Sequence, residues 1–398
     1  MTTSLYPFAR RMAHVEPFRV MDIQQRAFEL EAAGRSVIHM EIGQPDFAAP
    51  APVLERARQL LDDERLGYTD SLGLPQLRTA IAQFHAVQSG VVVDPTRVMV
   101  TTGASGALMT LLGSLVNPGD EWLMPDPCYP CNRHMVSLFG GLPRLIPTSA
   151  QSQFQLSAAT VREHWRPHTR GVLLASPSNP TGTRIAPDEL RAVHAEVRAN
   201  GGVLIVDEIY LGLTYGARRD SALALGEDVF VVSSFSKYFA MTGWRLGWLV
   251  APPDAMRGLE RFAQNATICP PALAQHAALA AFEPASLAIC EARREEFQAR
   301  RDDLIPALQG IGFKVPTLPD GAFYVYADCS ALATDSARLA RELLEAAGVA
   351  LTPGDDFGVH EPQRWLRFAY TCDRTLLRQA VARLKEALPH IKCAVGAA

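Results

Sequence analysis

Residues 234–247 read SFSKYFAMTGWRLG, and this stretch decides how the rest of the chain is interpreted. The chain has 38 Lys and Arg residues, yet Lys237 is the only lysine before Lys314. Arginine also supplies charge and hydrogen bonds, but its pKa is too high for it to lose a proton and attack a carbonyl. A lysine among aromatic neighbours can do so, because desolvation lowers its pKa. Lys237 is therefore a candidate nucleophile, the alternative being a chance survivor of an Arg-rich composition.

The overall composition is that of an ordinary globular protein. Apolar residues make up 48% of the 398 positions and charged residues 20%, and the length suggests two or three domains. A net charge of -4 gives no electrostatic reason to expect a nucleic acid or a membrane surface as a partner. The sequence lacks an apolar run of about 18 residues, so we expect no membrane span. Residues 1–11 show no signal-peptide pattern.

Seven scattered cysteines, an odd number, predict free thiols in a reducing cytoplasm. Cys128 and Cys131 have the CxxC spacing of redox and metal sites. Such a role needs a second cysteine pair or a thioredoxin-like context, and the sequence has neither. We interpret the pair as structural and expect no metal site.

Short apolar runs alternate with amphipathic segments over the first 250 residues. The runs lack polar alternation, which is typical of parallel strands buried on both faces. The pattern predicts an α/β domain with a mainly parallel seven-stranded sheet flanked by helices. The runs are 37–42, 97–101, 121–124, 171–175, 203–206, 229–233 and 246–250, and the amphipathic segments include 76–88, 106–116 and 187–199.

After residue 253 the pattern changes to long helical stretches and then to a smaller α+β unit. Its expected strands are 312–315, 322–327, 349–352 and 365–370, with helices at 336–347 and 374–388. We therefore predict an N-terminal arm and helix joining the small domain (1–36), a large domain (37–290) and a small domain (291–398). The boundary between the last two is expected inside a long helix.

Three polar features follow apolar runs, where open α/β sheets bind their ligands. Asp207 ends the run GVLIVD. If its carboxylate is buried, it needs a cationic partner, which could be Lys237 or a protonated pyridine nitrogen. The alternative is an ordinary loop aspartate or one that caps a helix. Asn179 lies in SPSNPTG, which is at least a tight turn. Residues 101–107, TTGASGA, favour a phosphate cradle but match neither the Walker nor the dinucleotide pattern.

Taken together, these residues resemble the class I/II aminotransferases, pyridoxal-phosphate (PLP) enzymes with the aspartate-aminotransferase-like fold called fold type I. The resemblance extends from 37 to 388. Residues 234–247 are similar to the family's cofactor-lysine signature. Other similar segments are GQPDF (43–47), YTDSLGL (68–74), PCYP (127–130), the Asn179 turn and DEIY (207–210).

The resemblance implies a role for each of these residues. Lys237 would hold the cofactor as a Schiff base and then move a proton between the substrate Cα and the cofactor C4′. Asp207 would keep the pyridine nitrogen protonated. Asn179 and Tyr210 would hydrogen-bond the ring 3-oxygen, and Tyr129 would stack on the ring.

The remaining implied roles concern the phosphate and the substrate. The phosphate would be bound by Ala104, Ser105, Ser234, Ser236 and Arg245. Tyr68 would reach the phosphate of the neighbouring subunit, which implies a homodimer. Arg367 would clamp the substrate α-carboxylate, with Asn179 and Gly43 close to the substrate; the alternative for Arg367 is a solvated strand arginine.

The resemblance implies an aminotransferase of amino-acid metabolism that exchanges an amino group between an L-amino acid and a 2-oxo acid by a ping-pong mechanism. A PLP-dependent C–S lyase on the same fold, acting by β-elimination, remains the alternative. Some relatives that use dicarboxylates carry lysine where this chain has Ser105, which argues against an acidic substrate. Phe18, Val20 and Ile38, near segments expected to line the pocket, suggest a neutral or aromatic side chain.

Two other classes of protein are less consistent with the sequence. The S-x-x-K pattern of penicillin-binding hydrolases requires SDN and KTG elements, and neither string occurs. A transcription regulator on this fold would need a DNA-binding module, and the 36 residues before the first apolar run are too few for one.

Overall fold

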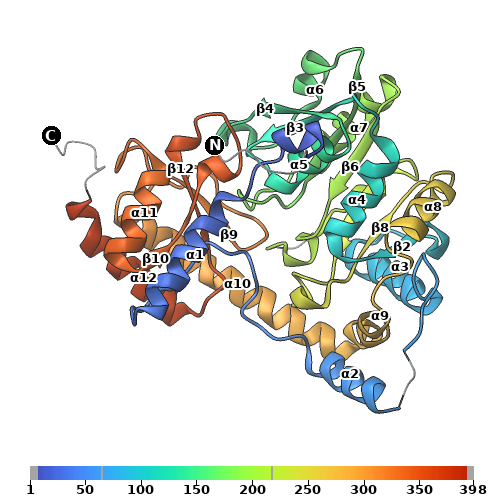
Figure 1. The fold of residues 1–398 in the computed structure, drawn as a ribbon, viewed down its shortest axis with the longest axis horizontal. Helices are drawn as coiled ribbons and strands as arrows, with labels where there is room; N and C mark the ends of the chain where they lie inside the picture. The colour runs from blue at the N-terminus through green and yellow to red at the C-terminus, as the bar shows by residue number, and fades with distance from the viewer. Residues whose placement is uncertain (1–7, 64–65, 217, 392–398) are drawn as a thin grey trace.

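The computed structural model describes residues 8–63, 66–216 and 218–391, and these form two lobes joined by one long helix (Figure 1). Helix α10 (Pro284–Gly310) runs from the larger lobe into the smaller one without a break, as the sequence predicts for the boundary region. Residues 1–7 of the predicted arm and 392–398 of the predicted small domain lie outside the described part. The exact domain limits stay a prediction.

The large lobe is built on the mainly parallel seven-stranded sheet that the apolar runs predict. Only β8 runs antiparallel to both of its neighbours. Its inner strands β7 and β8 are buried along their whole length, and β6, β5 and β3 are buried except near their first residues, which explains their lack of polar alternation. In spatial order the strands are β2 (Val98–Thr101), β8 (Gly247–Val250), β7 (Phe230–Ser234), β6 (Val203–Asp207), β5 (Thr169–Ala175), β3 (Glu121–Asp126) and β4 (Leu142–Pro147).

Two strand assignments differ from the sequence prediction. The run 37–42 forms only β1 (Ile38–His39), which pairs in parallel with β10 (Val349–Ala350) of the small lobe and takes no place in the large sheet. The seventh strand is instead β4, at the edge beside β3. Its sequence LPRLIP contains two prolines and an arginine, and most of it is only partly buried, which suits an edge strand but hides it from an apolar pattern.

Helices cover both faces of the large sheet (Figure 1). Helix α7 has the bounds that the amphipathic pattern predicts, and its first turn carries Asp188 and Glu189, which favour a helix N-terminus. The helices of this lobe are α2 (Ala51–Asp63), α3 (Pro75–Ser89), α4 (Gly103–Leu115), α5 (Pro130–Leu138), α6 (Ala158–His164), α7 (Pro187–Ala199), α8 (Met256–Ala266) and α9 (Ala272–Ala278).

The small lobe contains a three-stranded antiparallel sheet in the order β11 (Thr352–Pro353), β12 (Trp365–Ala369) and β9 (Tyr324–Asp328). The predicted strand at 312–315 is reduced to a single bridge between Lys314 and Asp328. Helices α11 (Ser336–Ala347) and α12 (Arg374–Ala387) have nearly the predicted bounds. Helix α1 (Arg19–Ala32) packs with α11 although it lies at the other end of the sequence (Figure 1).

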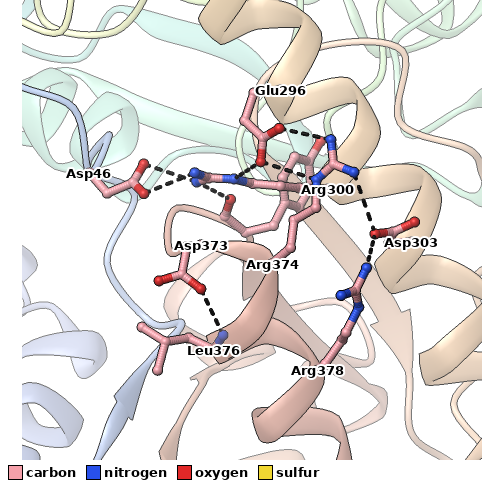
Figure 2. Close-up of polar contacts among 9 residues, drawn as sticks. Asp46, Glu296, Arg300, Asp303, Asp373, Arg374, Leu376 and Arg378 are labelled. Atoms are coloured by element: carbon pink, nitrogen blue, oxygen red, sulfur yellow. Dashed lines mark hydrogen bonds and ion pairs between the residues drawn. The ribbon is translucent and has the colours of Figure 1, made fainter.

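An ion-pair network joins the two lobes near α10 (Figure 2). Arg300 of α10 binds both oxygens of Asp46 at 2.9 and 3.0 Å and also Glu296 at 3.1 Å. Arg374 of α12 binds Glu296, and Arg378 binds Asp303. Over the described residues, no helix combines the length and apolar character needed to cross a membrane.

Candidate active site

A cavity of about 280 Å³ lies where the carboxyl ends of the parallel strands face the small lobe. The ends of β5, β6 and β7 and the start of α4 supply one side of it, and β9, β12 and the start of α1 supply the other. Among its lining residues are most of those predicted from sequence: Gly43, Ala104, Ser105, Tyr129, Asn179, Asp207, Tyr210, Ser236, Lys237, Arg245 and Arg367. Residues from seven separate segments therefore meet in one place.

Lys237 lies three residues beyond β7, in the tight turns that follow that strand. Its Nζ donates a hydrogen bond to the carbonyl oxygen of Gly43 at 2.6 Å. Burial, together with the charges of Arg367 and Arg245, lowers the pKa of the Lys237 amine to about 8, against the opposing effect of Asp207. At pH 7 about a tenth of this lysine is therefore an uncharged, nucleophilic amine, against well under one in a thousand for an ordinary lysine.

Asp207 is the last residue of β6 and is 5% exposed. Burial raises the pKa of its carboxyl group to about 6, while a hydrogen bond from the Ile209 N–H at 3.0 Å opposes the shift. Lys237 acts on this pKa only at a distance, and among the residues that the structure describes no cationic side chain forms an ion pair with Asp207. Of the two partners suggested by the sequence, the lysine is thus not in place, and a protonated ring nitrogen in the cavity would fill that role.

Arg367 lies in the middle of β12 and is 5% exposed, so it is not the solvated strand arginine of the alternative reading. It donates to Asn179 Oδ1 at 2.9 Å, to Thr352 Oγ1 at 3.1 Å and to the carbonyl oxygen of Glu41. Its Nε is buried without a partner, and the guanidinium lies 4.5 Å from the ring centre of Tyr324. Neutral groups hold it rigid and leave its charge for an anionic ligand.

Tyr210 and Tyr324 form a buried pair of hydroxyl groups 2.8 Å apart. Tyr210 follows β6, as the DEIY segment indicates, whereas Tyr324 opens β9 and was not singled out by the sequence analysis. A side-chain carbon at Gly43 would collide with the Tyr324 hydroxyl. Glycine at this position therefore lets the backbone carbonyl approach Lys237 closely.

The predicted phosphate end of the cavity is formed by α4 and the turn after β7. Ala104 and Ser105 occupy the first turn of α4, where free N–H groups favour an anion. Arg245 adopts a left-handed backbone (φ 52°) and its NH1 donates to the Thr242 carbonyl oxygen at 3.0 Å. A side-chain carbon on Gly103 would come within 3.0 Å of the Arg245 guanidinium, so the helix start and the arginine are close neighbours.

Two predicted cofactor-binding residues do not line the cavity in this chain. The Ser234 hydroxyl accepts from the Ser236 N–H at 3.0 Å and lies 3.0 Å from the Leu246 carbonyl oxygen, so it supports the turn that carries Ser236. Tyr68 lies between α2 and α3, and 84% of it is exposed.

The residues near α1 are partly as the sequence suggests. Phe18 and Val20 line the cavity, and the Phe18 ring is stacked on Tyr129 with centroids 6.4 Å apart. Ile38 does not line it, because β1 pairs with β10 and buries that side chain in the small-lobe core. Lining residues that sequence reasoning missed are Met21, Ile42, Leu108, Ile209, Thr242, Tyr324, Asp356 and Phe357.

Cys128 and Cys131 flank Tyr129 and are both free thiols. Cys128 is buried, and its burial raises the pKa of the thiol to about 12. Burial also raises the pKa of Cys131. Neither thiol lines the cavity, which supports the interpretation of the pair as structural.

The comparisons with known proteins agree on one family. The family described as aminotransferase class I and II matches residues 35–384. A valine–pyruvate aminotransferase of Mycobacterium tuberculosis is 39% identical over 379 residues, which cover 95% of this chain and 97% of that protein. An aspartate aminotransferase of Geobacillus stearothermophilus is 33% identical, over 94% of this chain and 97% of that protein.

Solved structures are equally close. A crystal structure of an aminotransferase from Mycobacterium tuberculosis superposes with a TM-score of 0.93 at 39% identity, covering 97% of this chain and 100% of that one. The aspartate aminotransferase from Thermus thermophilus with maleate gives a TM-score of 0.91 at 32% identity, with 96% and 100% covered. The chain belongs to the aminotransferase class I and II family, whose members depend on PLP, and it is an aminotransferase.

Proposed function

We propose that this aminotransferase moves an amino group between an L-amino acid and a 2-oxo acid in two half-reactions at one site, a ping-pong mechanism that depends on Lys237. The observation that carries the proposal is a buried amine with a pKa lowered to about 8, which shares one cavity with Asp207 and Arg367. Among the described residues, these three groups are, respectively, a nucleophile, an anion that forms no ion pair with a cationic side chain and a cation that forms none with an anionic side chain. Each lacks the kind of partner that PLP and an amino acid would provide.

The residues present fit PLP as the cofactor. When bound, it supplies an aldehyde that combines with amino groups and a ring that withdraws electrons from the substrate Cα. The Lys237 amine is placed to form the covalent link to that aldehyde. Asp207 would hold a protonated ring nitrogen, and Asn179 and Tyr210 would donate toward the ring oxygen. Tyr129 lines the cavity and would stack on the ring.

The phosphate end would be held by the first turn of α4 and by the turn after β7. Ala104 and Ser105 offer backbone N–H groups there, and Ser236 and Arg245 offer a hydroxyl and a guanidinium. Ser234 acts indirectly, because its hydroxyl holds the N–H of Ser236. A bound phosphate would therefore fix the cofactor at the end of the cavity opposite Arg367.

The substrate carboxylate would bind Arg367, whose planar guanidinium is already oriented by Asn179 and Thr352. With the carboxylate fixed, the substrate Cα is held within reach of the Lys237 amine. That amine then takes the Cα proton and returns it on the cofactor side, as a general base and acid. The Gly43 carbonyl, 2.6 Å from Nζ, keeps the amine directed into the cavity.

We further propose that the enzyme is a homodimer in which Tyr68 reaches the phosphate bound by the partner subunit. The support is its 84% exposure, together with its absence from the residues that line the cavity of its own chain. Tyr68→Phe should raise the dissociation constant for PLP, measured by equilibrium dialysis, and light scattering should give twice the mass of one chain. A monomer that binds PLP normally would contradict this arrangement.

The free thiols of the described part support a cytoplasmic location, and the reaction itself supports a role in amino-acid metabolism and biosynthesis.

The deciding experiment mixes the holoenzyme with single amino acids in the absence of any 2-oxo acid. We expect loss of the cofactor's near-visible absorbance and release of one matching 2-oxo acid per subunit, with the absorbance restored by an added 2-oxo acid. Pyruvate released together with ammonia or sulfide, with the absorbance unchanged, would instead establish the β-elimination lyase.

A further inference from the structure

The relatives named above include one called after valine and one called after aspartate, and these two substrates differ in the charge of their side chains. The part of the cavity beside the start of α1 is lined mainly by apolar groups. These are Phe18, Val20, Met21, Ile42 and Phe357. Apolar walls favour an apolar side chain, because a charged one would lose its hydration there without compensation.

The cations that line the cavity are already assigned. Among its described lining residues they are Lys237, Arg245 and Arg367. The lysine serves the cofactor aldehyde, Arg245 the phosphate and Arg367 the substrate α-carboxylate. No lining cation remains within this chain for a second carboxylate on the substrate. Ser105, on α4, is uncharged as well.

Asp356 adds a negative charge to the same wall. It is 3% exposed, and its Oδ1 accepts a hydrogen bond from the Arg19 N–H in the first turn of α1 at 2.7 Å. Arg133 donates to the backbone carbonyl of Asp356 at 2.9 Å, not to the carboxylate. Among the described residues, no cationic side chain forms an ion pair with this carboxylate. Burial raises the pKa of Asp356, while the Arg19 N–H and the charges of Arg367 and Arg133 oppose that shift. The two arginines act on the carboxylate only at a distance, so they offset its charge in part, and the remainder acts on whatever enters the cavity.

We propose that the site selects amino acids and 2-oxo acids with uncharged, apolar side chains, and that Asp356 determines this specificity by repelling a second carboxylate. The inference rests on the proposed function, because it assumes that the α-carboxylate binds Arg367. Both half-reactions use one cavity, so the exclusion applies to the acceptor as well. The acceptor is then a 2-oxo monocarboxylate rather than 2-oxoglutarate.

The first test compares steady-state kinetics of the wild-type holoenzyme and Asp356→Asn. The amide oxygen can still accept the Arg19 N–H, so the variant removes the charge while retaining the helix contact. We expect the wild type to prefer L-leucine over L-glutamate by at least about 100-fold in kcat/KM. In Asp356→Asn that ratio should fall by about tenfold, or about 1.4 kcal/mol, chiefly through a lower KM for glutamate.

Asp355→Asn is the matched control. Asp355 is the neighbouring residue, but it lines a separate cavity of about 730 Å³ between α1 and α11. The leucine-to-glutamate ratio should stay at its wild-type value in this variant. A change as large as in Asp356→Asn would show that the effect arises from disturbing α1, and the proposal would be wrong.

The second test measures binding without chemistry. Calorimetry of the holoenzyme should show tighter binding of 4-methylpentanoate than of glutarate, and Asp356→Asn should tighten only glutarate. Equal binding of the two acids, preference for a basic amino acid, or equal effects of Asp356→Asn on leucine and glutamate would each overturn the proposal. Failure of the proposed function is distinguishable, because then no amino acid of any class would be transaminated to its matching 2-oxo acid.

Discussion

Buried cations in this enzyme have two kinds of partner. Arg300, which is 3% exposed, binds the carboxylates of Asp46 and Glu296 in the network that joins the lobes (Figure 2). Arg367, which is 5% exposed, binds an amide oxygen, a hydroxyl and a carbonyl. Lys237 likewise donates to a carbonyl, that of Gly43. Carboxylates neutralise the first cation, and neutral dipoles merely orient the other two.

The difference separates stability from ligand binding. A buried cation paired with a carboxylate is satisfied in the empty protein and has little attraction left for an anion. A buried cation held by neutral dipoles keeps its charge for a ligand, at some cost to the folded chain. Substitutions in the ion-pair network should therefore change the free energy of unfolding, and substitutions of the cavity cations should change turnover and ligand binding.

The largest expected effect is that of Lys237→Ala on turnover. Removing the nucleophile and general base should lower kcat by at least about 10⁴-fold, because no other cavity group can form the covalent link. Dimer mass and circular dichroism should stay the same. Lys314→Ala, at an exposed position of the small lobe, is the control and should retain activity. Full turnover in Lys237→Ala would contradict the proposed mechanism.

Arg367→Lys comes next. An ammonium group keeps the charge but lacks the planar fork, so KM for the amino acid should rise by about 100-fold with a smaller change in kcat. Arg364→Lys provides the comparison, because Arg364 lies just before the same strand and binds Asp328 and Glu361. Steady-state kinetics should show a normal KM in that variant. Similar KM values in Arg367→Lys and Arg364→Lys would show that an arginine held by neutral groups matters no more for substrate binding than one paired with carboxylates.

The pH dependence of PLP capture tests whether Lys237, held only by a carbonyl, has a lowered pKa. The reactive form of Lys237 is the uncharged amine, so the rate of covalent PLP capture by the apoprotein should rise with pH and level off above about 8. Below that point the rate should rise about tenfold per pH unit. Stopped-flow absorbance would follow it. A rate that continues to rise to pH 10 would show that the pKa of the lysine is not lowered.

Much of the large lobe could be predicted because each central strand is a local apolar run. The edge strand β4 was missed, since an exposed edge tolerates prolines and arginine. The partner of β1 was also missed: Ile38 pairs with Val349, and nothing local to either residue indicates a contact over that distance in sequence. Residues 312–315 have a strand-like composition, but they meet β9 only at its last residue, where Lys314 bridges Asp328.

The residues that line the cavity also fall into a group that local sequence predicts and a group that only packing brings in. Lys237, Asp207 and Asn179 follow strands in recognisable segments, so their meeting could be predicted. Tyr324 and Asp356 come from the small lobe without any motif, and only the packing of that lobe brings them to the cavity. Sequence reasoning thus predicted most of the lining residues at the ends of the large-lobe strands and fewer of those that the small lobe and α1 contribute.

Arg300→Met tests the network side of the comparison. Breaking a largely buried pair leaves Asp46 and Glu296 without their shared cation, so we expect a loss of about 2–3 kcal/mol in the free energy of unfolding. KM for the amino acid should change little, because Arg300 does not line the cavity. Urea denaturation of the holoenzyme at fixed protein concentration measures the first quantity. An unchanged urea midpoint together with a raised KM would show that Arg300 serves substrate binding and not stability.

The smallest effect is expected for Arg378→Ala, in the same network. Arg378 binds Asp303 at 3.2 Å, but 70% of its side chain is exposed. Water screens that attraction, and ordering two long side chains costs entropy, so the loss should be at most about 0.5 kcal/mol. Urea denaturation beside Arg300→Met shows whether burial or the mere presence of an ion pair decides the effect. Equal losses of unfolding free energy in the two variants would mean that burial does not decide how much an ion pair stabilises the fold. The contrast between Arg300 and Arg367 would then depend only on whether the partner is a carboxylate or a neutral group.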